Sequence, residues 1–104
     1  MSKVDGLNIE NLRLLIASEQ VVWTEHLVLR MLERNIKRAD AIECIENGEI
    51  IESYPDAYPY PACLVFAMLP SNNVRDDDKP LHVVAGIGEN KLFIITVYYP
   101  TLQK

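Results

Sequence analysis

His26, Arg30 and Arg34 are spaced four residues apart, so a helix would place all three side chains on roughly one face. An imidazole beside two guanidinium groups can bind an anion such as a phosphate. His26 would then act as a general acid or base while the two arginines hold the phosphate. In the structural alternative, His26 hydrogen-bonds a strand carbonyl and the arginines pair with carboxylates. Structural ion-pair networks often resemble functional sites, so the spacing leaves both interpretations open.

The second histidine, His82, lies near the start of an expected strand. Alternation along that strand puts His82, Val84 and Gly86 on one face. His82 could complete an acid/base pair with His26, and metal-independent RNA cleavage needs such a pair beside cations that stabilise the phosphorane. The alternative is that His82 fills a half-buried polar position in the sheet.

Composition limits the functional class of this 104-residue chain, which is long enough for one domain. About half of the residues are hydrophobic (49%), so a real core can form. The net charge of −5 argues against a protein that coats nucleic acid with a broad basic surface. From Arg30 to Arg38, however, the sequence contains four basic residues and only one acidic residue. Such a local basic spot suits a single phosphate or an acidic peptide.

The cysteines and the apolar runs point to a reduced, cytoplasmic protein. Cys44 and Cys63 are too few for a disulfide framework, and they lack the short ligand spacing of a structural zinc site. We therefore expect no metal and no cofactor. Residues 1–10 are polar, unlike a signal peptide, and no apolar run approaches the length of a membrane span. No contact with a membrane is expected.

Hydrophobic periodicity predicts helices first and strands afterwards. Helices are expected over Asn8–Ser18, Thr24–Arg34 and Arg38–Glu46, and Val21–Trp23 is a short extended entry between the first two. Thr24 is expected to cap the second helix at its N-terminus. Asn35 and Gly48 are expected to end the second and third helices in the left-handed conformation. Strands are expected over Glu49–Tyr54, Cys63–Leu69, Leu81–Ile87 and Leu92–Tyr99, with the proline-rich segment 55–61 as a rigid loop and Pro70–Pro80 as an acidic, mobile loop.

This order of elements predicts an α+β domain. The N-terminal helices should pack on one face of a four-stranded, mainly antiparallel sheet. Residues 1–20 are interpreted as an N-terminal helical extension, and residues 21–104 as the single α+β domain. Five tyrosines are many for such a chain, and they can stack RNA bases or simply pack strands and loops: Tyr54, Tyr58, Tyr60, Tyr98 and Tyr99.

Several short motifs resemble, in order, those of a small bacterial family called domain of unknown function 4258. The resembling segments are Thr24-Glu25-His26, Arg30-Met31, Glu33-Arg34 and Ile36, Glu46-Asn47-Gly48-Glu49-Ile50-Ile51-Glu52, Pro59-Tyr60-Pro61 with Cys63-Leu64-Val65, Pro80-Leu81-His82-Val83-Val84, and Ile95-Thr96-Val97-Tyr98 before Pro100. The family is similar to the RelE/BrnT toxin-like group of small ribonucleases. The resemblance implies a helical start followed by an antiparallel sheet, and an antitoxin-like protein as partner. It also implies that Tyr98, at the end of the last strand, lies near a toxin-type site.

Two functional hypotheses follow. The first is a toxin-type domain, either a metal-independent endoribonuclease acting on RNA or a degenerate relative, with His26, Arg30, Arg34, His82 and Tyr98 as its catalytic residues. The second is a non-catalytic domain that binds a partner protein or assembles as a homodimer. The acidic net charge favours the second, since it is unlike that of a ribosome-directed toxin.

Overall fold

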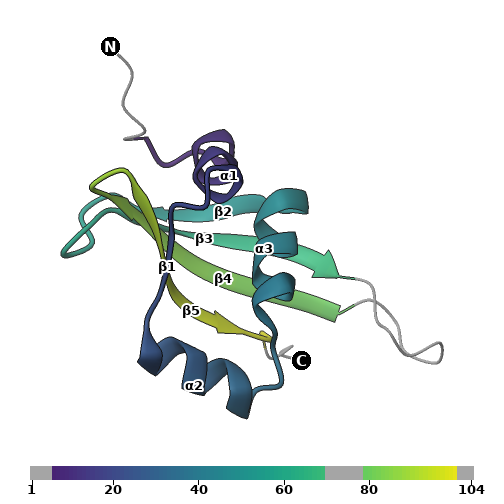
Figure 1. The fold of residues 1–104 in the computed structure, drawn as a ribbon. Coiled ribbons are helices and arrows are strands. Elements are labelled where there is room, and N and C mark those ends of the chain that lie inside the picture. Colours follow the sequence, from purple (N-terminus) through teal and green to yellow (C-terminus); the bar gives the residue numbers. More distant parts are fainter. Residues whose placement is uncertain (1–5, 70–78, 101–104) are drawn as a thin grey trace.

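A computed structural model describes residues 6–69 and 79–100, and within them three helices and five strands form a two-layer α+β arrangement (Figure 1). The elements are α1 (Ile9–Ala17), β1 (Val21–Trp23), α2 (Glu25–Glu33), α3 (Arg38–Asn47), β2 (Glu49–Tyr54), β3 (Ala62–Leu69), β4 (Lys79–Gly88) and β5 (Lys91–Tyr98). Figure 1 shows α3 crossing β3 and β4, while α2 lies beside β5. The predicted fold class and the order of elements are confirmed.

Polar side chains fix where the helices begin. The side chain of Asn8 accepts a hydrogen bond from the Asn11 amide at 2.8 Å, and Thr24 accepts one from the Leu27 amide at 3.1 Å. Each bond satisfies an amide that has no partner inside its helix. Thr24 was the cap expected from the sequence, and it starts the helix that carries His26. Asn35 has a φ of 58°, so the predicted left-handed end of this helix is also confirmed.

The sheet has five strands in the order β1-β5-β4-β3-β2, so the prediction of four strands is corrected. The additional strand is Val21–Trp23, which pairs with Leu92–Ile94 in parallel orientation. All other neighbouring strands pair antiparallel. Three β-prone residues indicate an extended segment, but they carry no information about which distant strand provides their hydrogen-bonding partner.

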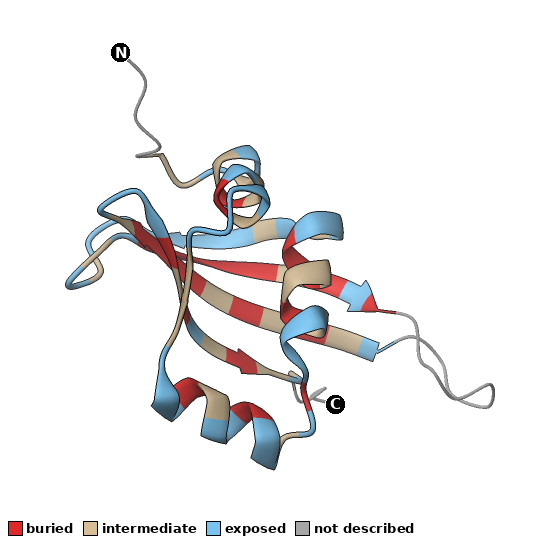
Figure 2. Ribbon diagram, in the orientation of Figure 1, coloured by how far each residue is buried: buried red, intermediate tan, exposed pale blue. Residues whose placement is uncertain are grey.

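The three described helices pack on one face of the sheet, and among the described residues no helix lies on the other, which we call the uncovered face. The covered face buries Val65, Leu81 and Val83 together with Leu27 and Met31 of α2. Figure 2 shows this buried band along the central strands, whereas most of β2 is exposed. Since successive strand residues point to opposite faces, His82 and Phe66 lie on the uncovered face. The predicted alternation along β4 is confirmed.

The N-terminal helix shares this core. Leu12 and Leu15 of α1 are buried in the same cluster as the α3 and strand residues. Arg13 of α1 also donates hydrogen bonds to the carbonyl oxygens of Ile45 and Gly48, both at 3.0 Å, where α3 ends. The division of the chain at residue 20 stays a prediction, and α1 supports the sheet layer directly by burial and by hydrogen bonds.

Gly48 ends α3 for a different reason from the one expected. Its φ is −103° and its backbone is extended, so the left-handed conformation predicted there is wrong. A Cβ atom at Gly48 would collide with the carbonyl oxygens of Cys44 and Phe66. Glycine is needed because two backbone segments approach closely at this position.

The two long connections differ in what the structure describes. Most of the predicted acidic loop, from Pro70 to Asp78, lies outside the described residues, and Lys79 and Pro80 already belong to β4. β4 and β5 are joined by a tight turn in which Glu89 and Asn90 both have positive φ, at 52° and 61°. Two left-handed residues in succession match the twist of an antiparallel hairpin.

Candidate functional site

A row of three rings crosses the uncovered face of the sheet. Phe66, His82 and Tyr98 are register partners on β3, β4 and β5. The His82 ring meets Phe66 edge-on at 5.7 Å between centroids and Tyr98 edge-on at 5.3 Å. All three side chains are half-buried, so their edges stay accessible to a ligand. Within this row two of the predicted catalytic residues, His82 and Tyr98, are in contact.

The polar contact within this row joins His82 to Tyr98. The Nδ1 atom of His82 lies 3.2 Å from the hydroxyl of Tyr98, which is hydrogen-bonding distance. Either group can donate, depending on the tautomer of the imidazole. An imidazole and a phenol in contact can pass a proton between them, which is the basic requirement for acid/base chemistry.

His26 and Arg30 lie apart from that pair. Both are exposed on α2, whose buried side chains, Leu27 and Met31, pack into the core on the covered face. His82 and Tyr98 point to the other face. Helical spacing correctly placed His26 and Arg30 on one exposed side of α2, but spacing within a helix says nothing about the sheet face opposite. Their catalytic role therefore stays a prediction.

Arg34 binds the backbone of the sheet. Its Nη1 atom donates a hydrogen bond to the carbonyl oxygen of Val97 at 2.9 Å. Strand β1 pairs with β5 at Leu92–Ile94, so Val97 lies beyond the parallel pairing, on the outer edge of β5. A cation at an edge carbonyl satisfies an acceptor that no neighbouring strand reaches. This contact accounts for Arg34 without a phosphate and without a carboxylate.

The loop between β2 and β3 forms a second feature on the uncovered face. Tyr60 stacks on Phe93 of β5 with centroids 5.0 Å apart and planes inclined by 22°. Its ring covers Gly88, where a Cβ atom would run into the ring carbons. Its hydroxyl donates to the carboxylate of Glu89, and this hydrogen bond is the main reason that the pKa of Tyr60 is raised above its usual range.

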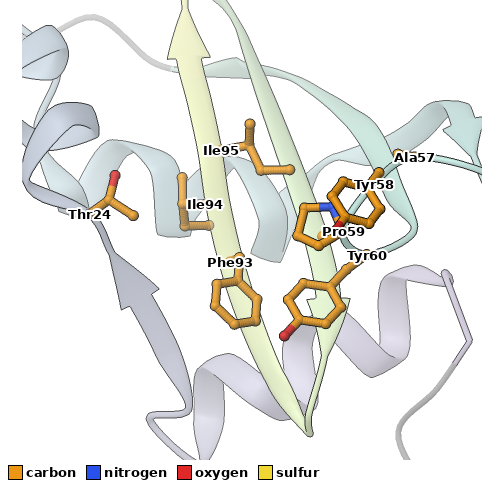
Figure 3. A pocket seen from close by; sticks show the side chains of 9 residues that line it. Thr24, Ala57, Tyr58, Pro59, Tyr60, Phe93, Ile94 and Ile95 are labelled. Atoms are coloured by element: carbon orange, nitrogen blue, oxygen red, sulfur yellow. The ribbon is translucent and has the colours of Figure 1, made fainter.

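A cavity of about 320 Å³ opens between this loop and β5. Figure 3 shows Tyr58, Pro59 and Tyr60 from the loop facing Phe93 and Ile95 of β5. Ala57, Gly86, Ile94 and Thr24 complete its wall. Sequence reasoning considered the tyrosines but missed the pocket. Gly86 and Gly88 on one strand face were the available signal, because a face without side chains leaves room for another segment to lie on it.

The charged residues of the uncovered face are mainly acidic. Glu49 opposes Phe66 and Glu52 opposes Leu64, so both carboxylates alternate onto this face at the β2 edge. Among the described strand residues of this face, Lys91 is the one basic side chain. It lies opposite Gly88, at the hairpin end of β5. Glu89 adds a carboxylate beside it. The face therefore offers a phosphate backbone little positive charge.

The two cysteines are buried, free thiols on the covered side of the sheet. Burial raises the pKa of Cys44 to about 12 and that of Cys63 to about 11. A nucleophilic thiol needs the opposite shift and access to solvent. Neither cysteine is suited to chemistry.

The described residues show neither a metal site nor a membrane-spanning helix. Within residues 6–69 and 79–100, no three His, Cys, Asp or Glu side chains come together in a way that could hold a metal ion. None of the helices in those ranges is long and apolar enough to cross a membrane.

Comparison with known proteins yields one match. The family described as domain of unknown function (DUF4258) matches residues 23–99, which is most of the chain and includes all five predicted catalytic residues. No curated protein and no solved structure matches the chain significantly.

Proposed function

The chain belongs to the DUF4258 family, a domain of unknown function, and on that premise we propose that it is a non-catalytic protein-binding domain that docks a partner protein on the uncovered face of its sheet. One observation carries this proposal: the face that none of the three described helices covers has apolar and aromatic side chains where a solvated sheet face usually has polar ones. They include Phe66, Val84, Phe93 and the half-exposed Met68 and Ile95, at 50% and 51% exposure.

The balance of charge supports a protein partner over RNA. Arginine and lysine side chains that could neutralise phosphates are concentrated on α2 and at the start of α3, away from the uncovered face. RNA binding and cleavage need cations close to the backbone and to the reacting phosphate. An apolar surface with carboxylates at its edge instead resembles the core and rim of a protein interface.

Site-specific crosslinking tests the docking face. A photo-crosslinking amino acid replaces Thr96, which is half-buried in the middle of the face, or Ala39, which is exposed on α3. The two variants are irradiated in the native host, and any protein crosslinked by the Thr96 variant is identified, purified and titrated against the wild-type chain by calorimetry. Binding of that purified protein, with crosslinking from position 96 and not from position 39, is the expected result. Crosslinks to a second copy of this chain, or none at position 96, would overturn the proposal.

The second candidate function is a metal-independent endoribonuclease of the RelE/BrnT toxin type, and the His82–Tyr98 contact favours it. In this version His82 and Tyr98 exchange protons with the RNA. For His26 and Arg30 to assist, the RNA would have to reach from the uncovered face to the exposed side of α2, and Arg34 would have to release the Val97 carbonyl. Purified wild type, His82→Ala, Tyr98→Phe and His26→Ala are compared for cleavage of single-stranded RNA and for growth inhibition on expression. Cleavage by the wild type that His82→Ala abolishes would establish the enzyme; equal inactivity of all four proteins would remove it.

The cytoplasm is the proposed location of this function. The two free, buried cysteines support it, because a reducing compartment keeps such thiols unpaired.

A further inference from the structure

We infer that the cavity between the β2–β3 loop and β5 is an anchor pocket that takes one aromatic or large aliphatic side chain from a basic segment of a partner protein. This inference rests on the proposed docking function, which it extends by naming what the face recognises. Binding energy at protein interfaces is concentrated in a few such anchors that fill pockets near the centre of the contact.

The dimensions and lining of the pocket suit a side chain. Its volume of about 320 Å³ is at the small end of the roughly 300–1,000 Å³ of ligand pockets, enough for one indole or phenyl group. Pro59, Phe93 and Ile95 offer apolar contact, and Tyr58 stands at the rim with 95% of its surface exposed. An exposed tyrosine beside a preformed pocket can close over an inserted ring at low conformational cost.

The polar atoms of the lining argue against a nucleobase as the occupant. Reading a base requires donors and acceptors aimed at its edge. The Thr24 hydroxyl oxygen already accepts the Leu27 amide, and the Tyr60 hydroxyl already donates to Glu89. Each hydroxyl therefore already uses part of its hydrogen-bonding capacity within the fold. An apolar side chain makes no demand on them.

Contacts between the β2–β3 loop and the strands hold the walls of the pocket in place. Tyr60 is held between its stack on Phe93 and the bond from its hydroxyl to Glu89. The loop is tied to β4 by the hydrogen bond from the Ile87 amide to the Pro61 carbonyl at 3.1 Å. Gly86 has no side chain to fill the floor of the pocket, and a Cβ atom there would lie 3.0 Å from the Pro61 oxygen and 3.4 Å from the Ile95 side chain, so a larger residue would crowd the wall. A pocket whose walls are largely preformed binds at a reduced ordering cost.

Charge determines what should flank the anchor. The carboxylates of Glu49, Glu52 and Glu89 share this face with Lys91, and the whole chain carries a net charge of −5. Lysine or arginine beside the anchor would complement these carboxylates and accelerate association. A second copy of this chain would present the same acidic face and be repelled.

Designed peptides test the pocket directly. The probe is a lysine-rich peptide of nine residues with one central tryptophan, compared with the same peptide carrying alanine at the centre and with a glutamate-rich peptide carrying tryptophan. Backbone amide NMR of the full chain follows each titration. We expect shifts at Tyr60, Gly86 and Ile95 with the basic tryptophan peptide, and at least tenfold weaker binding of the other two.

Two isoleucines provide a matched pair of variants. Ile95 lines the pocket, whereas Ile51 lies outside it on the edge strand β2; both are about half exposed, at 51% and 45%, and both sit at a bulge. Ile95→Ser should weaken the basic tryptophan peptide about tenfold, and Ile51→Ser by less than twofold. An equal loss of affinity for the basic tryptophan peptide in both variants would overturn the inference of an anchor pocket. Equal binding of the tryptophan and alanine peptides by the wild type would overturn it as well.

These results separate the inference from the function on which it rests. If a protein crosslinked through position 96 binds the wild type and Ile95→Ser equally well, the docking face stands and the pocket is not its anchor. If the tryptophan peptide binds the pocket but no protein crosslinks at position 96, the docking function fails while the apolar site stands.

Discussion

The guanidinium of Arg34 at the end of α2 donates to the carbonyl oxygen of Val97 on β5, 2.9 Å away and on the outer edge of the sheet. This bond fastens the helix that carries His26 to the last strand. It also gives the Val97 carbonyl oxygen a hydrogen-bond donor where the parallel pairing with β1 has ended.

Removing this guanidinium should destabilise the protein. We expect Arg34→Ala to lower the free energy of unfolding by about 1–3 kcal/mol, because a charged donor is lost and the Val97 carbonyl keeps only solvent as partner. Arg30→Ala, on the exposed side of the same helix, should change it by less than about 0.5 kcal/mol. Equilibrium unfolding in urea measures both. Equal effects of the two variants would contradict the structural role of Arg34.

Gly88 should tolerate a methyl group only when Tyr60 is absent. Its φ is not positive, so alanine suits the backbone, but the new Cβ would collide with the Tyr60 ring. Gly88→Ala should therefore cost about 1–3 kcal/mol by overpacking. In the Tyr60→Ala background the same change should cost much less, giving a coupling energy of about 0.5–3 kcal/mol in a double-mutant cycle. Additive effects would show that the ring does not occupy this position.

The buried thiols predict a loss of stability in alkali. The native state holds the protons of Cys44 and Cys63 up to a pKa of about 12 and about 11, whereas the unfolded chain releases them near the ordinary thiol pKa of 9.0. Above pH 9 the native state therefore binds more protons, so the free energy of unfolding falls as pH rises. Each thiol lowers the free energy of unfolding by at most about 1.4 kcal/mol per pH unit.

Urea unfolding between pH 8 and 10 measures this slope, below the range in which the tyrosines dominate. The Cys44→Ala/Cys63→Ala variant is the control and should show a clearly smaller dependence on pH. Both thiols should also resist a thiol reagent at pH 8 until the protein is unfolded. Rapid labelling of the folded protein would contradict their burial.

Two tyrosine–glutamate pairs can be separated by titration. A hydrogen bond to Glu89 raises the pKa of Tyr60, and one to Glu52 raises the pKa of Tyr54. In Glu89→Gln the pKa of Tyr60 should fall toward its ordinary value while that of Tyr54 stays unchanged, and Glu52→Gln should do the reverse. Ring-carbon NMR across pH 8–12 resolves the two phenols. A shift of both in either variant would show that the pairs are not independent.

Local signals in the sequence were sufficient for most elements of the fold. Thr24 indicated the start of α2, because its hydroxyl can accept a hydrogen bond from an amide of the first helical turn. The alternation along β4 placed His82 on the correct face of the sheet. The match to DUF4258 is likewise carried by contiguous motifs. These signals depend on neighbours in the chain, which a single sequence displays.

Long-range partners were beyond the reach of those signals. Val21–Trp23 is equally extended whether it pairs with β5 or with nothing, so the fifth strand was missed. The three prolines of segment 55–61 predicted a rigid loop, but they did not predict that this loop packs Tyr60 onto Phe93 of β5. That packing creates the pocket. Arg34 shared a helical face with His26, yet its partner was a backbone oxygen that no pattern of side chains reveals.

The parallel pairing of β1 with β5 has a consequence for how the chain folds. Strand β1 can pair only once β5 is in place, because β5 is its hydrogen-bonding partner. This edge of the sheet therefore forms only after the long segment between the two strands has closed into a loop. The β2–β3 and β4–β5 hairpins are local and can form early. Because ordering of α2 beside β5 depends on the same late step, we expect the His26 helix to be among the last parts of the molecule to gain protection from hydrogen exchange during refolding.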